Sequence, residues 1–214
     1  MKIQTIAKAS LLAAALVVSA SAAHAVTLTS SIAFNDGSFV YPDASDSITL
    51  PSGASWDVAA QVRTGNQNGV FRTPWDETSN GTVQNGSVND PGDIQYFATG
   101  PGNQPNPAKL SFGNDQNSLS FLWGSPDTYN DLIFYLAGSV VAEFQGSPIT
   151  GSPSAGSVFV TYTGLFDEVW FKSDPNNAFE FASITATPVP LPAAGWLLLA
   201  GIGGLVVMRR KRSA

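Results

Sequence analysis

The sequence predicts an all-β protein: an antiparallel β-sandwich of jelly-roll type with about ten strands, followed by one C-terminal transmembrane helix. Three observations predict this architecture. Runs of aromatic and β-branched residues alternate with a period of two between residues 26 and 187. Gly, Pro, Asn and Asp separate these runs, and no stretch there has a helical period. An apolar segment and four consecutive cations close the chain.

The expected strands share this alternation and are bounded by turn-forming residues. They are residues 28–34, 54–62, 93–99, 109–112, 118–123, 131–137, 140–145, 157–163, 167–173 and 178–186. Their number and spacing favour two packed sheets with Greek-key connections. Residues 65–93 and 100–107 are expected to form long loops.

Residues 1–25 have the features of a secretory signal peptide. Two lysines precede an apolar run at residues 11–20, and Ala23 and Ala25 form a small-x-small cleavage site. The run is too short to span a bilayer, so we expect cleavage after Ala25 rather than retention as an anchor. Cleavage removes the only histidine, and the chain contains no cysteine.

The body of the chain is acidic and lacks several reactive groups. Residues 26–188 carry four basic and sixteen acidic side chains, a formal net charge of −12. We therefore expect no nucleic-acid partner, because phosphate backbones require a basic surface. Without His and Cys, Ser-His-Asp and Cys-His triads and His or Cys metal ligands are excluded. The acidity is interpreted as solubility outside the cell, with cation binding as the alternative.

Residues 193–208 contain no charge and predict a membrane helix. Sixteen helical residues span about 24 Å, against a hydrocarbon core of about 30 Å. The segment is apolar on all sides, unlike a soluble amphipathic helix. The cations that follow are Arg209, Arg210, Lys211 and Arg212. By the positive-inside rule these cations stay in the cytoplasm and the body lies outside it.

The predicted organisation follows from these features. The segments are a signal peptide (1–25), an extracytoplasmic domain (26–187), a Pro-rich motif and linker (188–192), a transmembrane helix (193–208) and a cytoplasmic basic tail (209–214).

The residues before the helix, together with the helix and the cations, resemble the PEP-CTERM sorting signal of bacterial exported proteins. The motif is the VPLPA variant, formed here by Val189, Pro190, Leu191, Pro192 and Ala193. The resemblance implies an exosortase-like partner, a membrane-embedded cysteine transpeptidase that cuts near the motif while the cation cluster retains the substrate. Leucine stands where the usual motif has glutamate, which points to the variant system. The alternative is a plain single-pass anchor without processing.

A second resemblance lies within the body. Residues 121–135 and 166–184 are similar to stretches of one group of exosortase-dependent surface proteins. This resemblance implies a surface β-sandwich of unknown activity. The sorting resemblance of the tail implies a location in the inner membrane, and then at the cell surface or outside the cell after processing.

Aromatic side chains in the body are open to two interpretations. Trp75, Trp123 and Tyr129 are candidates for stacking on sugar rings of a surface polysaccharide, and Trp75 in its loop is expected to be the most exposed. The alternative is that they belong to the core, as most large aromatics in a sandwich do. Trp170, which alternates with Val169 and Phe171, is expected to pack inside.

Oxygen-rich loops suggest a calcium site. Asp174, Asn176 and Asn177 are the main candidates, and two further Asx-rich loops have similar composition. None has EF-hand spacing, and the alternative is that these side chains bond their own backbone in turns. No other cofactor is expected.

Carboxylates are the remaining candidates for catalysis. Glu143, Glu168 and Glu180 lie within expected strands, where alternation predicts that they point outward into solvent. The sequence therefore favours a non-enzymatic exported protein of the cell envelope or extracellular matrix. A carbohydrate-binding module is the alternative, and a glycan-active enzyme with paired carboxylates is the third hypothesis.

Overall fold

The computed structural model describes residues 26–32, 42–43, 45–75, 93–146 and 157–190. These residues form a sheet of nine strands in which every pairing between strands is antiparallel. A 3-10 turn, η1 (Asp46–Ile48), lies between β1 and β2. The predicted all-β class is confirmed at this level.

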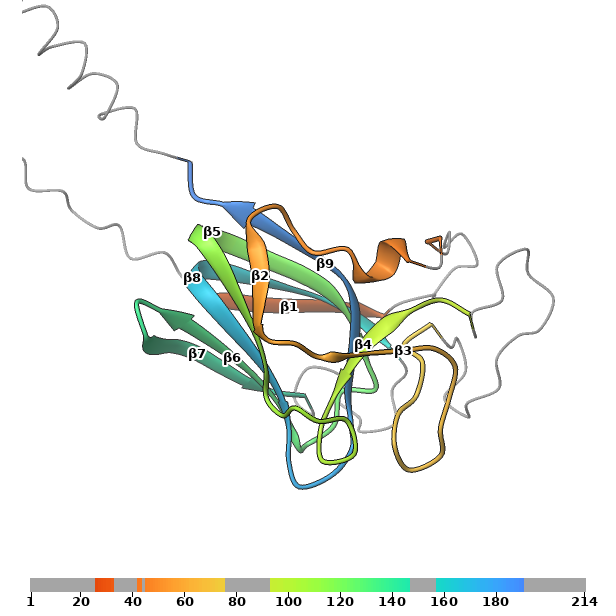
Figure 1. The fold of residues 1–214 in the computed structure, drawn as a ribbon. Coiled ribbons are helices and arrows are strands. Elements are labelled where there is room, and N and C mark those ends of the chain that lie inside the picture. Colours follow the sequence, from red (N-terminus) through yellow and green to blue (C-terminus); the bar gives the residue numbers. More distant parts are fainter. Residues whose placement is uncertain (1–25, 33–41, 44, 76–92, 147–156, 191–214) are drawn as a thin grey trace, which may run out of the picture.

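The strands follow the chain order shown in Figure 1. They are β1 (Thr27–Ile32), β2 (Ala54–Val58), β3 (Gln61–Arg63), β4 (Tyr96–Thr99), β5 (Ala108–Gly124), β6 (Asn130–Leu136), β7 (Ser139–Gln145), β8 (Val158–Ser173) and β9 (Phe179–Pro188). Their order in the sheet is β3-β4-β9-β5-β8-β6-β7, with β1 beside β8 and β2 beside β5.

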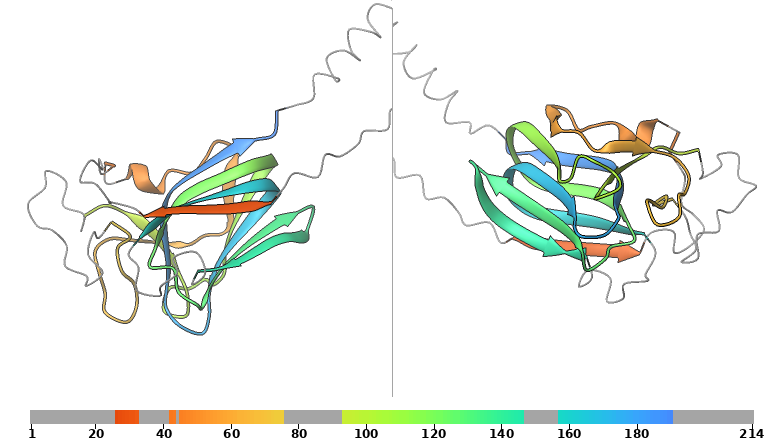
Figure 2. Two further views of the ribbon diagram at one scale, coloured as in Figure 1. Left: turned by 180° about the vertical axis from the view of Figure 1, so that it is seen from behind. Right: turned by 60° about the horizontal axis from the view of Figure 1, so that its bottom comes forward.

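Two long strands, β5 and β8, organise the sheet. They pair with each other almost throughout, with register shifts on either side of Gln116. The first part of β5 also pairs with β2 and the later part with β9. The first part of β8 pairs with β1 and the later part with β6, as the two views of Figure 2 show. Both strands therefore change neighbours at the same place.

Side chains from the two ends of these strands meet in one core. Phe171, near the end of β8, stacks on Phe181 of β9 with ring centroids 4.0 Å apart. Tyr162, near its beginning, stacks on Phe134 of β6 at 3.6 Å. All four rings are fully buried, and each such burial contributes roughly 1.5–3 kcal/mol. At the change of neighbours, a Cβ on Gly164 would lie 2.5 Å from the Tyr162 hydroxyl, so this position requires glycine.

A second, smaller core covers the opposite face of β4 and β9. Its buried members are Trp75, Ile94, Tyr96, Ala98, Leu122 and Ala182. As a result, β4 and the first part of β9 are covered on both faces, and all four residues of β4 and the first four residues of β9 are buried. Strict in–out alternation therefore fails in these strands.

The observed strands differ from the predicted ones at two joins. Residues 109–112 and 118–123 belong to the single strand β5, and 157–163 and 167–173 to β8. Bulges carry the pairing through turn-forming residues such as Asn114 and Gly164, which locally resemble loops. The predicted strand 54–62 is split into β2 and β3. The predicted loop at 100–107 is confirmed.

None of the described residues lies in a helix with the length and apolar character needed to cross a membrane. The predicted span at 193–208, the signal peptide and the loop segment 76–92 fall outside the described residues.

Candidate functional site

The C-terminal motif begins where the sheet ends. Strand β9 finishes at Pro188, and the N–H of Val189 donates a hydrogen bond of 2.9 Å to the carbonyl of Asp115. Val189 is half-buried and Pro190 is exposed. The remaining motif residues (Leu191, Pro192 and Ala193), the cluster Arg209–Arg212, and Ala23 and Ala25 lie outside the described residues.

The two ends of the body emerge at the same end of the sheet. Thr187 of β9 pairs with Ser118 of β5, and Ser118 pairs with Thr163 of β8. Thr163 pairs in turn with Thr27 of β1. Three strand spacings separate Thr187 from Thr27, a distance of about 14 Å. Figure 1 shows the start of β1 and the end of β9 on one side of the molecule.

The opposite end of β9 carries a network of polar loops. Two of the predicted oxygen-rich loops, at residues 127–131 and 174–177, meet there. The amide of Asn130 donates to the Ser173 hydroxyl at 3.0 Å and to the carbonyl of Ala178 at 3.1 Å. The backbone N–H of Asp174 donates to the carbonyl of Tyr129 at 3.0 Å. With β9 ten residues long, this network lies roughly 30 Å from the start of the motif.

The candidate calcium ligands make bonds within this network. The Asn177 side chain accepts from the N–H of Gly102 at 2.5 Å and donates to the carbonyl of Gly69 at 3.2 Å. Asp174 and Asn176 are exposed. No group of three or more Asp, Glu, His or Cys side chains suited to a metal occurs in the described parts of the chain. The Asn177 side chain therefore joins its loop to two segments that are distant in the sequence, rather than bonding its own backbone as the turn alternative expects.

The structure buries two of the three aromatic residues expected to contact glycan. Trp75 is 1% exposed, not solvent-facing as predicted, because its segment folds back onto the sheet and its indole N–H donates to the carbonyl of Gln95 at 3.3 Å. Trp123 is fully buried and stacks on Phe179 at 4.2 Å. Tyr129 is half-buried, and its hydroxyl donates to Asp127 at 2.7 Å.

Glu180 was expected to point into solvent and is instead buried, with 4% exposure. Its Oε1 accepts the backbone N–H of Arg72 at 2.8 Å. Burial above all, with a smaller contribution from the neighbouring charge of Asp127, raises the pKa of this carboxyl to about 8 against the lowering effects of backbone N–H donors and of Arg72. The carboxyl is therefore mostly protonated at neutral pH.

The segment that covers Glu180 approaches the sheet closely. A Cβ added to Gly124 would lie 2.9 Å from the Cβ of Pro74 and 3.2 Å from the Cβ of Glu180. Nearby, Tyr96 donates to the carbonyl of Gly65 at 2.6 Å, and burial, followed by the charge of Glu180, raises the pKa of this phenol. Burial also raises the pKa of Asp127. Because this segment covers Glu180, the carboxyl is not open to a polymeric substrate. Its position is that of a structural residue.

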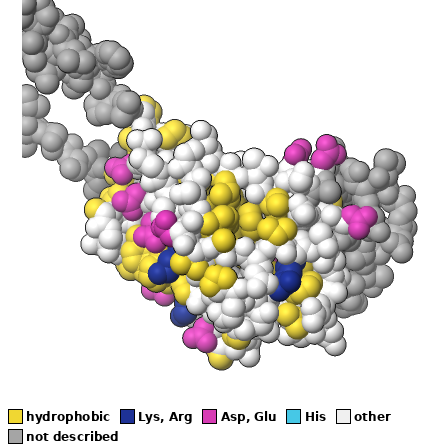
Figure 3. Space-filling view, in the orientation of Figure 1, with side chains coloured by type: hydrophobic (Ala, Val, Ile, Leu, Met, Phe, Trp, Pro, Cys, Tyr) yellow, Lys and Arg dark blue, Asp and Glu magenta, His cyan; other side chains and the backbone are white. Residues whose placement is uncertain are grey.

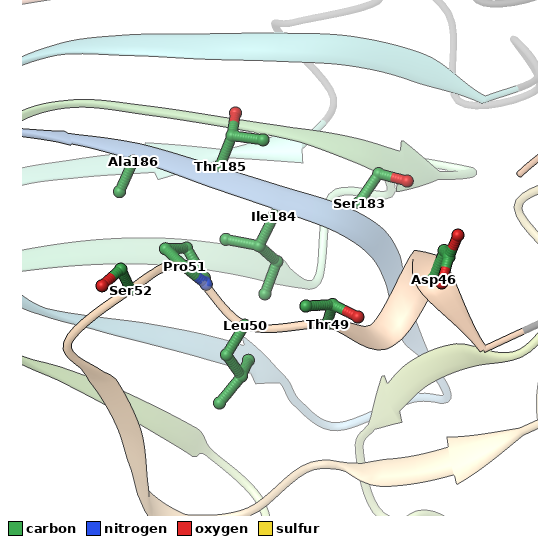
Figure 4. A pocket seen from close by; sticks show the side chains of 9 residues that line it. All are labelled: Asp46, Thr49, Leu50, Pro51, Ser52, Ser183, Ile184, Thr185 and Ala186. Atoms are coloured by element: carbon green, nitrogen blue, oxygen red, sulfur yellow. The ribbon is translucent and has the colours of Figure 1, made fainter.

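A shallow pocket of about 450 Å³ lies between η1 and β9. Figure 4 shows the Ile184 and Leu50 side chains pointing in the same direction, while Ser183 and Thr185 point the other way. Asp46 is the one titratable side chain among its lining residues. The pocket therefore lacks the two facing carboxylates that glycoside hydrolysis requires.

Comparisons with known proteins found no match. No model of a protein family matches it, and neither a curated protein nor a solved structure does.

Proposed function

We propose that the chain is an exported, non-catalytic surface protein whose β-rich body is held at the membrane by its C-terminal segment and released or transferred by an exosortase-like enzyme. The observation that carries the proposal is the exit of the chain. Strand β9 leads directly into Val189, and the hydrogen bond from Val189 to Asp115 fixes the start of the motif against the sheet. The described start of the motif, Val189 and Pro190, therefore lies at the edge of the body, and in sequence it directly precedes the predicted membrane segment.

The position of the N-terminus supports the same arrangement. Val26, the first residue after the predicted signal cleavage, precedes β1 at the end of the sheet from which the C-terminal segment leaves. The N-terminus left by the predicted signal cleavage and the segment that leads to the predicted membrane helix thus share one side of the body. The polar loop network lies on the other side. A body tethered in this way exposes its far end and its sheet faces to the surroundings.

We further propose that the sheet is a two-layered sandwich of jelly-roll type. The change of neighbours along β5 and β8 divides the strands into two groups, one with β9 and β1 and one with β2 and β6. Ring contacts between the groups, such as Trp56 to Phe97 at 5.1 Å, support facing layers.

Sorting is tested by intact mass and location of the protein in its native host. We expect the wild-type species to end near Val189–Ala193, outside the membrane fraction. The Pro190→Ala/Pro192→Ala double variant should keep its tail through Ala214 and stay in the membrane, because the motif is no longer recognised. Pro188→Ala, which changes the last residue of β9, is the matched control and should be processed normally. A wild-type protein with its full tail, unaffected by the double variant, would reduce the segment to a simple anchor.

A further inference from the structure

Two aromatic rings pack against each other on the outer face of the sheet. Trp170 of β8 and Tyr135 of β6 have ring centroids 4.5 Å apart with an interplanar angle of 34°. Their strand neighbours Val169, Phe171 and Phe134 are fully buried, so alternation turns Trp170 and Tyr135 away from the core. Both rings are half-buried rather than enclosed. The expectation that Trp170 packs inside is therefore wrong.

Polar groups surround these two rings. The Lys109 ammonium of β5 lies 3.9 Å from the Trp170 ring centroid, and the Trp170 indole N–H donates to Glu168 at 2.5 Å. Burial, followed by the neighbouring charges of Glu168 and Glu143, raises the pKa of the Tyr135 phenol. Across the sheet, one row joins Lys109, Trp170, Ile133 and Glu143 on four neighbouring strands.

The row, together with the neighbouring pair Tyr135 and Glu168, defines a strip with a specific chemistry. Four strands span about 14 Å, which suits an extended chain rather than a single small molecule. The strip combines ring surface with carboxylate acceptors and an ammonium donor, the groups that contact the apolar faces and the hydroxyls of sugars. Lys109 has a flexible stem, so its ammonium can move from the Trp170 ring to a ligand hydroxyl. Figure 3 shows hydrophobic, basic and acidic side chains mixed on the face that carries β5 and β8.

Charge selects among extended partners. With twelve more acidic than basic residues between 26 and 188, the body repels nucleic acids, anionic lipid surfaces and acidic polysaccharides. The acidic groups beside the rings, Glu143 and Glu168, add to this repulsion locally. A neutral polymer with many hydroxyls meets no such barrier.

We propose that the strip formed by Tyr135, Trp170, Lys109, Glu143 and Glu168 binds a neutral polysaccharide chain. The inference rests on the proposed function, because an exported body is the one that meets extracellular polysaccharide. It also relocates carbohydrate recognition from the buried Trp75 and Trp123 to the outer sheet face.

The test is affinity gel electrophoresis of the full chain in non-ionic detergent. The gels contain mixed-linkage β-glucan, dextran, xylan or galactomannan, with alginate as the anionic polymer. We expect retardation by at least one neutral polymer and none by alginate. Tyr135→Ala and Trp170→Ala should each weaken binding at least tenfold, whereas Val62→Ala, at an exposed position on β3, should bind as the wild type does.

A conservative variant separates binding from loss of the fold. Trp170→Phe keeps a ring and should retain binding, but should lose the change in tryptophan fluorescence that the polymer produces in the wild type. Failure of all four neutral polymers to retard the protein would overturn the proposal, as would equal retardation of wild type and Tyr135→Ala, or stronger retardation by alginate. None of these readouts depends on tail processing, so the sorting experiment remains a separate test of the proposed function.

Discussion

Replacing Glu180 with glutamine is expected to stabilise the protein at pH 9 by up to about 5 kcal/mol and to remove most of its loss of stability between about pH 4.5 and 8. The buried carboxyl has a pKa of about 8 in the folded protein, against a usual value of 4.5. Between these values the folded state holds a proton that the unfolded state has released. Stability is therefore complete below about pH 4.5 and falls by about 1.4 kcal/mol per pH unit as the pH rises toward 8.

Glutamine keeps the interaction that the carboxyl makes without its ionisation. Its side-chain oxygen can accept the Arg72 N–H in the place of Glu180 Oε1, and its amide carries no charge at any pH. Asp127 also has a raised pKa, so Glu180→Gln should retain a smaller pH dependence at the acidic end. Tyr96 and Tyr129 titrate above their usual range and do not contribute below pH 9.

The measurement is urea unfolding of the full chain in detergent between pH 5.5 and 9. Glu143→Gln, at an exposed glutamate of β7, is the matched control and should show the wild-type pH dependence. Equal slopes of unfolding free energy against pH for Glu180→Gln and wild type would contradict the account of a buried, protonated carboxyl.

Asn130→Ala is expected to destabilise the protein by about 3–5 kcal/mol. Asn130 is fully buried and joins three partners: its oxygen accepts the N–H of Asp127 at 3.0 Å, and its amide donates to Ser173 and Ala178. Alanine leaves the part-buried Asp127 N–H and the buried Ala178 carbonyl without this partner, and each such group costs about 1–3 kcal/mol. The melting temperature should fall by roughly 10 °C.

Asn177→Ala provides a graded comparison within the same network. The bonds of Asn177 to Gly102 and Gly69 are exposed, so water can replace the lost groups. Its loss should be about 1 kcal/mol or less. Calorimetry or thermal circular dichroism measures both variants. Equal losses for Asn130→Ala and Asn177→Ala would show that burial does not determine the strength of the network.

The sequence predicted strands well where one face is buried and the other is wet. β6 is an example, because Leu132 and Phe134 alternate with Asp131 and Ile133. The pattern failed where both faces are covered. Glu180 lies between two core phenylalanines, Phe179 and Phe181, and the segment that covers it is about 110 residues earlier in the chain. The local alternation of apolar and polar residues cannot indicate that long-range packing.

The aromatic residues show the same limit. Trp75 lies in a loop, which predicts exposure, yet its loop returns to the sheet and encloses it. Trp170 alternates with core residues, which places it on the opposite face, and that position was the available signal for an outward-facing ring. The continuity of β5 through Gly113 and Asn114 was equally hidden, because bulged pairing depends on the partner strand.

The central claim is that the body lies outside the cytoplasm and the basic tail inside it. The chain has no cysteine, so single cysteines report position without background. In the Pro190→Ala/Pro192→Ala variant, which is expected to keep its tail, Thr128→Cys marks the exposed far end of the body and Ser213→Cys marks the tail. A membrane-impermeant maleimide applied to spheroplasts of the native host should label Thr128→Cys in intact spheroplasts and Ser213→Cys only after their lysis. Labelling of Ser213→Cys in intact spheroplasts, with Thr128→Cys protected until lysis, would contradict the account.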